Sequence, residues 1–279
     1  MLAVGRLLAL ASLAILAGCL QNVFYQPDRV LYDTPARAGL KFDRVVFPSG
    51  DGTKLVGWFI PAAGYANPRN AKGTVVHFHG NAQNLSAHWR FVEWLPRRGY
   101  NVFVFDYRGY GGSEGAPEPR GVYQDSMSAL DYVRTRADVD PEKLVVLGQS
   151  LGGANAIAVV GSGNRAGVKA IAIEATFYSY SSIASEKVSG TGSFMDDTYA
   201  PERFIAALAP MPFLLIHGTA DPVIPYGHSK RLFEKAGGPK RLVTIEGGGH
   251  CVAFAPENLD RYADLLLEFF DAALALPRA

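Results

Sequence analysis

Charged residues are sparse in this chain: they make up 19% of its 279 residues, and the formal net charge is only +1. Proteins that bind nucleic acids carry a strong basic surplus, so this balance argues against a nucleic-acid partner. Low-complexity segments and internal repeats of fixed period are also missing. The length suits one large buried core in a single α/β domain.

No apolar run near the start is long enough to span a bilayer. Residues 7–17 are apolar or small and follow the cation Arg6, but eleven residues are too few for a membrane-crossing helix. They fit the apolar region of a secretory signal, and Leu16-Ala-Gly-Cys19 resembles the bacterial lipoprotein signal. The resemblance implies cleavage before Cys19 and a lipid on that residue. An ordinary signal peptide with an incidental cysteine is the alternative.

Cysteine is equally scarce, since only Cys19 and Cys251 occur. With Cys19 acylated, no intramolecular disulfide is possible, so packing must stabilise the mature chain. We therefore predict a signal peptide over 1–18, a short tether over 19–39 and a single folded domain over 40–279. The lipid would anchor the exported protein to a membrane of a bacterial cell envelope.

Strands and helices alternate along the predicted domain. Runs that are apolar on both faces indicate buried parallel strands, and a Gly-rich turn at 48–52 indicates an antiparallel hairpin before them. The pattern predicts an α/β fold with a mostly parallel sheet and helices on both faces, including one helix over 85–98. Residues 178–210 interrupt the alternation and are expected to form a small cap over the site; a surface loop is the alternative.

Ser150 lies at the corner between a predicted strand and a predicted helix, in Gly148-Gln-Ser-Leu-Gly152. A Gly-x-Ser-x-Gly sequence in this context is a nucleophile elbow, in which a strained turn exposes the serine hydroxyl. The flanking glycines permit the strand and helix to approach closely. The alternative is a serine that only caps the helix.

A serine hydroxyl needs a neighbouring base, and six histidines are available. Only His250 stands in a Gly-rich loop after a strand. We expect His88 and His228 to be surface residues and His217 to be a structural hydrogen-bonding residue. His77 and His79 alternate on one strand face, but no carboxylate completes a ligand set, so no metal site is predicted.

The third member of a triad holds the imidazole in the correct tautomer. Asp221, in His217-Gly-Thr-Ala-Asp221, is the preferred candidate, and Glu174 at the end of the preceding strand is the rival. The order Ser150, Asp221, His250 is that of α/β hydrolases.

Two backbone amides are expected to bind the oxyanion of the transition state. The first is the N–H of Leu151, at a helix N-terminus that favours negative charge. The second comes from the loop after the strand at 74–79, where Asn81 is the expected donor and Ala82 the alternative.

Together these segments resemble the α/β-hydrolase superfamily, and more narrowly the branch that includes membrane-associated protein depalmitoylases and their bacterial relatives. The matching segments are His79-Gly-Asn-Ala-Gln-Asn84, Phe105-Asp-Tyr-Arg-Gly-Tyr-Gly-Gly-Ser-Glu-Gly115, Gly148-Gln-Ser-Leu-Gly-Gly153, Ile216-His-Gly-Thr-Ala-Asp221 and Gly248-Gly-His250. The resemblance implies the α/β-hydrolase fold and serine hydrolysis without a cofactor.

The expected substrate is a small-molecule ester, thioester or other acyl compound, cleaved through an acyl-serine intermediate. The same residues are compatible with an amidase, a peptidase or an acyltransferase. An inactive binding lipoprotein that kept the fold is a further alternative.

Overall fold

The computed structural model describes residues 24–276. Cys19 and the predicted signal peptide lie outside the described residues. Within them, no helix is both long and apolar enough to cross a membrane.

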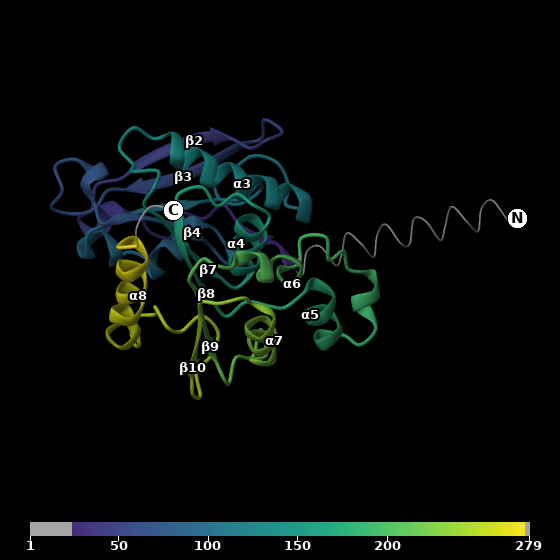
Figure 1. The fold of residues 1–279 in the computed structure, drawn as a ribbon. Coiled ribbons are helices and arrows are strands. Elements are labelled where there is room, and N and C mark those ends of the chain that lie inside the picture. Colours follow the sequence, from purple (N-terminus) through teal and green to yellow (C-terminus); the bar gives the residue numbers. More distant parts are fainter. Residues whose placement is uncertain (1–23, 277–279) are drawn as a thin grey trace, which may run out of the picture.

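An eight-stranded sheet forms the centre of the molecule, with helices packed against both of its faces (Figure 1). Only β3 runs antiparallel to its neighbours β2 and β6, so the predicted mostly parallel sheet with an antiparallel N-terminal pair is confirmed. The order across the sheet is β10 (Lys240–Ile245), β9 (Phe213–Gly218), β8 (Val168–Glu174), β7 (Leu144–Gln149), β4 (Gly73–Phe78), β6 (Tyr100–Phe105), β3 (Lys54–Ile60) and β2 (Asp43–Pro48).

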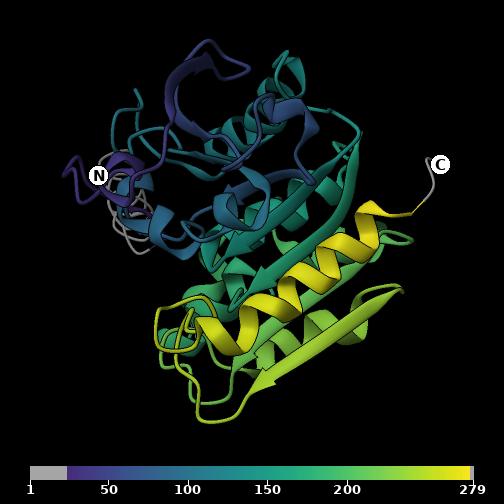
Figure 2. The same cartoon turned by 90° about the vertical axis from the view of Figure 1, so that its left-hand side faces the viewer.

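Neighbouring residues of the central strands point into two separate cores, because side chains alternate across a sheet. Val76 and Val146 pack into one core, beneath α3 (Pro119–Thr135), α4 (Leu151–Gly161) and α7 (Gly227–Lys235). Val75 and Val145 pack into the other, beneath α8 (Leu259–Leu274), which crosses the opposite face (Figure 2). Burial on both faces explains why these strands are apolar throughout.

The single helix predicted over 85–98 is wrong. The chain instead forms three short pieces, α2 (Leu85–His88), η3 (Trp89–Phe91) and η4 (Leu95–Arg98). Pro96 lies in the first turn of η4, where it lacks an N–H and disfavours α-helical backbone at the residue before it. Trp89 and Leu95 are fully buried, so packing holds the broken pieces in place.

The described part of the expected tether packs against the domain. Tyr25 is only 3% exposed, and β1 (Gln26–Pro27) pairs in parallel with β5 (Ala82–Gln83). A short helix, η1 (Pro35–Ala38), follows before the chain enters the sheet. The aromatic side chains at the start of this segment give it apolar surface to bury, which a free tether would lack.

Residues 178–210 are helical and lie at the edge of the molecule, beside the ends of the central strands (Figure 1). Their elements are α5 (Tyr180–Lys187), η5 (Thr191–Phe194), α6 (Pro201–Phe204) and η6 (Ile205–Leu208). Ser179 caps α5 reciprocally with Ser182, each side chain accepting from the backbone of the other. This segment forms part of the wall of the pocket described below.

Candidate active site

Ser150 occupies a strained corner between β7 and α4. Its φ of 52° and ψ of −122° are unusual for a residue with a side chain, and such conformations persist only where the surrounding structure enforces them. Close packing of the backbone around this corner is possible because the neighbouring residues are glycines. A Cβ on Gly152 would lie 2.1 Å from the carbonyl oxygen of Phe78, so only glycine permits α4 to begin so close to β4.

His250 lies within hydrogen-bonding distance of the Ser150 hydroxyl. Its Nε2 is 3.0 Å from the Ser150 Oγ, and its Nδ1 is 2.7 Å from Oδ2 of Asp221. Because a carboxylate only accepts, Nδ1 carries the proton and Nε2 is left to accept from the serine. The structure thus brings together three side chains separated by up to 100 positions in sequence.

The Asp221 carboxylate is fully buried and accepts four hydrogen bonds. Oδ1 accepts from the backbone N–H groups of Val223 and Ile224, at 2.8 and 2.9 Å. Oδ2 accepts from His250 and from Nε2 of His217, the latter at 3.1 Å. Burial alone would raise the pKa of Asp221, but the hydrogen bonds from His217 and His250 outweigh it and lower the pKa below its usual value. The carboxylate therefore stays ionised beside the imidazole.

Sequence reasoning missed the contact between His217 and Asp221. The His217 ring is fully buried; its Nε2 donates toward Asp221 and the Ile224 carbonyl, while Nδ1 accepts from the Ser229 hydroxyl. The spacing of four residues, on a strand end followed by a turn, was the only available signal. His217 thereby shares the Oδ2 atom of Asp221 with His250 and helps to hold the carboxylate in place.

Glu174, the rival acid, makes no contact with His250 among its hydrogen bonds. Its Oε2 accepts from the side-chain amide of Gln149 and its Oε1 from the backbone N–H of Ala253, both at 2.7 Å. It is 1% exposed, and burial raises its pKa. Glu174 therefore connects the residue before Ser150 to the loop that carries His250.

The loop after β4 passes directly beside the serine. A Cβ on Gly80 would lie 3.6 Å from the Cβ of Ser150. The Gly80 carbonyl accepts from Nδ1 of His79 at 2.8 Å. Because a trans peptide is planar, the Asn81 N–H of the same peptide unit points away from His79. Leu151 is the first residue of α4, where backbone N–H groups have no partner within the helix. Both expected oxyanion donors belong to residues that line the pocket.

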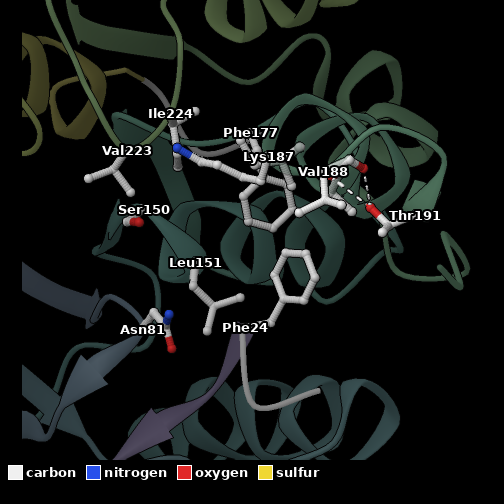
Figure 3. A pocket seen from close by; sticks show the side chains of 12 residues that line it. Phe24, Asn81, Ser150, Leu151, Phe177, Lys187, Val188, Thr191, Val223 and Ile224 are labelled. Carbon is white, nitrogen blue, oxygen red and sulfur yellow. Dashed lines mark hydrogen bonds between the residues drawn. The ribbon is translucent and has the colours of Figure 1, made fainter. Parts of the chain in front are cut away.

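An apolar hollow that is partly open to solvent lies next to Ser150 (Figure 3). Most of its walls are aliphatic or aromatic, and Lys187 is the only charged side chain among the described lining residues. Phe24, Leu151, Phe177, Ile183, Val188 and Ile224 form much of the apolar surface. Such a cavity suits a hydrocarbon chain better than a polar group.

Two histidines expected at the surface are partly or wholly buried, so that expectation is wrong. His228 is 1% exposed; its Nδ1 accepts from the backbone N–H of Tyr178, and its Nε2 donates to Glu186 of α5. His88 stacks on His79, with ring centroids 5.1 Å apart. Helix periodicity alone could not show these partners, because they come from distant segments. Among residues 24–276, no three or more His, Cys, Asp and Glu side chains gather as a metal site would require.

The parallel sheet, the strained serine at a strand–helix corner and the hydrogen-bonded line to an imidazole and a carboxylate define the class of α/β hydrolases. The family model described as "Serine aminopeptidase, S33" matches residues 69–203 and 193–257. The chain belongs to this family of serine-type α/β hydrolases.

Several known proteins are similar to the chain over most of its length. The uncharacterized protein YfhR of Salmonella typhimurium is 48% identical over 264 residues, covering 91% of this chain and 89% of the relative. The α/β hydrolase domain-containing protein WAV2 of Arabidopsis thaliana is 32% identical, with coverages of 82% and 79%. The structure of the Pyrococcus furiosus esterase Pf2001 matches with a TM-score of 0.73 at 18% identity, covering 90% of this chain and 100% of that one. That structural likeness shows a shared fold.

Proposed function

We propose that the protein is a serine esterase that hydrolyses carboxylic esters or thioesters with an apolar acyl group. The observation that carries this proposal is the hydrogen-bonded line from Asp221 through His250 to Ser150, together with the apolar pocket that Ser150 lines. The resemblance to depalmitoylases supports an acyl substrate and keeps thioesters within the proposal.

In the proposed acylation, Nε2 of His250 takes the hydroxyl proton while Oγ of Ser150 attacks the carbonyl carbon. The backbone N–H groups of Leu151 and Asn81 hold the oxyanion of the tetrahedral intermediate. As the intermediate collapses, the bond to the alcohol or thiol breaks and the leaving group takes the proton from His250. Water then attacks the acyl-serine with His250 as the base, which releases the acid and restores the serine. Asp221 stabilises the imidazolium in both halves.

The family description raises a second candidate, an aminopeptidase. Such an enzyme must bind the ammonium group at a peptide's N-terminus, which requires negative charge or well-placed acceptors. The described lining of the pocket includes no Asp or Glu, and its one charged side chain, Lys187, has the same sign as that ammonium. An uncharged acyl chain fits this lining better, which favours ester substrates.

A panel of p-nitrophenyl esters of increasing chain length, with matching anilides, tests the proposal. We expect ester hydrolysis, greatest for medium or long chains, and little anilide hydrolysis. Ser150→Ala should lower kcat by about 10³-fold or more and abolish labelling by a fluorophosphonate probe. Ser189→Ala, at an exposed position of the cap, is the matched control and should change neither. Anilide cleavage faster than ester cleavage would favour the peptidase, and no labelling at all would favour an inactive binding protein.

We also propose that the mature chain begins at an acylated Cys19, so that the enzyme is an exported lipoprotein held on a bacterial envelope membrane. The support is the short apolar run that ends in Leu16-Ala-Gly-Cys19. Intact mass spectrometry of the protein from bacterial membranes should show a lipid mass on a chain that starts at Cys19. An unmodified Cys19, or a start elsewhere, would refute the anchor without touching the esterase proposal.

A further inference from the structure

Phe24, the first described residue, is part of the pocket wall. Its ring centroid lies 6.2 Å from that of Phe177 and 5.2 Å from that of Tyr180, and the Phe24 and Phe177 side chains both line the apolar pocket, called the acyl pocket below (Figure 3). The chain therefore enters the domain at the substrate site.

The mouth of this pocket is bordered by exposed apolar side chains. Val188 and Val223 both line the pocket and are still 61% and 45% exposed. Phe194, 61% exposed, follows on η5 three residues after the lining residue Thr191. Side chains three apart on a 3₁₀ helix lie on the same face. We call Val188, Phe194 and Val223 the apolar rim. Exposed apolar side chains next to the mouth of a pocket are a candidate interaction surface.

We infer that the apolar rim lies on a lipid bilayer and that the enzyme takes long-chain acyl esters directly from that membrane. The inference rests on the proposed esterase function and on the proposed lipid at Cys19. Cys19 precedes Phe24 by five residues, which span at most about 18 Å when fully extended. The headgroup layer of one leaflet is roughly 5–8 Å thick. So short a connection keeps the pocket wall next to the membrane surface.

Because the apolar rim borders the pocket, a hydrocarbon chain can pass from the bilayer into the pocket along apolar surface. A hydrocarbon chain leaving the bilayer for water loses about fourfold in equilibrium population for every methylene exposed. A pocket whose apolar wall begins at the membrane surface removes that exposure, because the chain moves from lipid to protein without crossing water.

Charge cannot provide the contact. Lys187 is exposed at the mouth, but Glu186 beside it and Asp196 after η5 are exposed as well, so these three side chains have a net negative charge and offer no basic patch to anionic lipids. We therefore expect docking by apolar insertion, which functions on uncharged phosphatidylcholine and is insensitive to salt. Raising NaCl from about 0.1 M to about 1 M, which shortens the Debye length from about 10 to about 3 Å, should leave the rate on a bilayer substrate unchanged.

The test uses the full-length protein, purified from membranes and reconstituted on phosphatidylcholine vesicles. One substrate is a fluorogenic long-chain ester dissolved in the bilayer, and the other is water-soluble p-nitrophenyl acetate. Phe194→Asp changes a rim residue outside the described pocket lining. Val46→Asp is the control, because Val46 is 53% exposed on the edge strand β2. We expect Phe194→Asp to lower the bilayer rate about tenfold or more and to leave acetate hydrolysis unchanged.

Val46→Asp should change neither rate. An unaltered bilayer rate in Phe194→Asp overturns the inference, as does an equal loss on both substrates or an equal loss in Val46→Asp. If the wild-type protein cleaves the acetate but not the bilayer ester, membrane extraction is refuted while the esterase proposal stands. If it cleaves neither ester, the proposed function fails as well.

Discussion

Replacement of Glu174 by alanine tests whether the loop that carries His250 is held by a single buried carboxyl. The mutation leaves two buried donors without an acceptor, the Gln149 side-chain amide and the Ala253 N–H, at residues only 1% and 0% exposed. An unsatisfied buried donor costs about 1–3 kcal/mol. Together the two predict a loss of about 4 kcal/mol in the free energy of unfolding, a large share of a typical domain's stability.

Activity should fall as well, because Ala253 follows His250 by three residues. A shift of the imidazole by about 1 Å relative to Ser150 is enough to cost about 10²-fold in rate. Glu174 acts through the loop and touches no substrate, so kcat should fall while KM for a short ester stays nearly constant. Glu174→Gln keeps one acceptor oxygen, so its decrease in the free energy of unfolding should be about half that of Glu174→Ala.

Urea denaturation followed by circular dichroism gives the free energies of unfolding, and steady-state hydrolysis of p-nitrophenyl acetate gives kcat and KM. A free energy of unfolding of Glu174→Ala within about 1 kcal/mol of the wild-type value would refute this role of Glu174. The role is also refuted if KM rises with kcat unchanged, since that would make Glu174 part of the substrate site.

Three further outcomes are expected. Gly152→Ala should lower the melting temperature strongly or prevent folding, because its Cβ would meet the Phe78 carbonyl oxygen at 2.1 Å; Gly50→Ala, where a Cβ meets nothing within 4 Å, should be neutral in the same thermal scan. Burial lowers the pKa of His77 to about 3, so the unfolded chain binds a proton below about pH 6.5 while the folded chain does not. As the pH drops from about 6.5 to about 3, His77 should lower the free energy of unfolding by about 1.4 kcal/mol per pH unit. His77→Asn should flatten this slope in urea titrations. Phe24→Ala should enlarge the acyl pocket and shift the preferred p-nitrophenyl ester to longer or bulkier chains; an unchanged chain-length profile would remove Phe24 from the pocket wall.

The parts of the site that could be predicted from the sequence are those with local causes. The glycines around Ser150 indicate the strained corner, because the strand–helix crossing has no room for side chains there. His250 and Asp221 could be proposed because each follows a strand, and parallel strands bring their carboxyl ends to one edge of the sheet.

The parts that could not be predicted depend on contacts between distant segments. Strands of two residues, such as β1 and β5, are too short to show a hydrophobic periodicity. The pairing of β1 with β5 could therefore not be predicted from the sequence. His228 sits on a helix that reads as amphipathic, and its partners Tyr178 and Glu186 come from the cap. The break within 85–98 depends on packing of Trp89 together with Pro96.

The pairing of β1 with β5 has a consequence for any shortened form of the enzyme. The Gln26 N–H donates to the Asn81 side-chain oxygen at 2.9 Å, so β1 steadies the loop expected to bind the oxyanion. Proteolytic cleavage after residue 39 would leave the whole eight-stranded sheet in place. The cleaved enzyme would lose the hydrogen bond that holds the loop after β4 and the Phe24 side chain that lines the pocket. Under the proposed lipid anchor at Cys19, an active form can be released only by cleavage between Cys19 and Phe24.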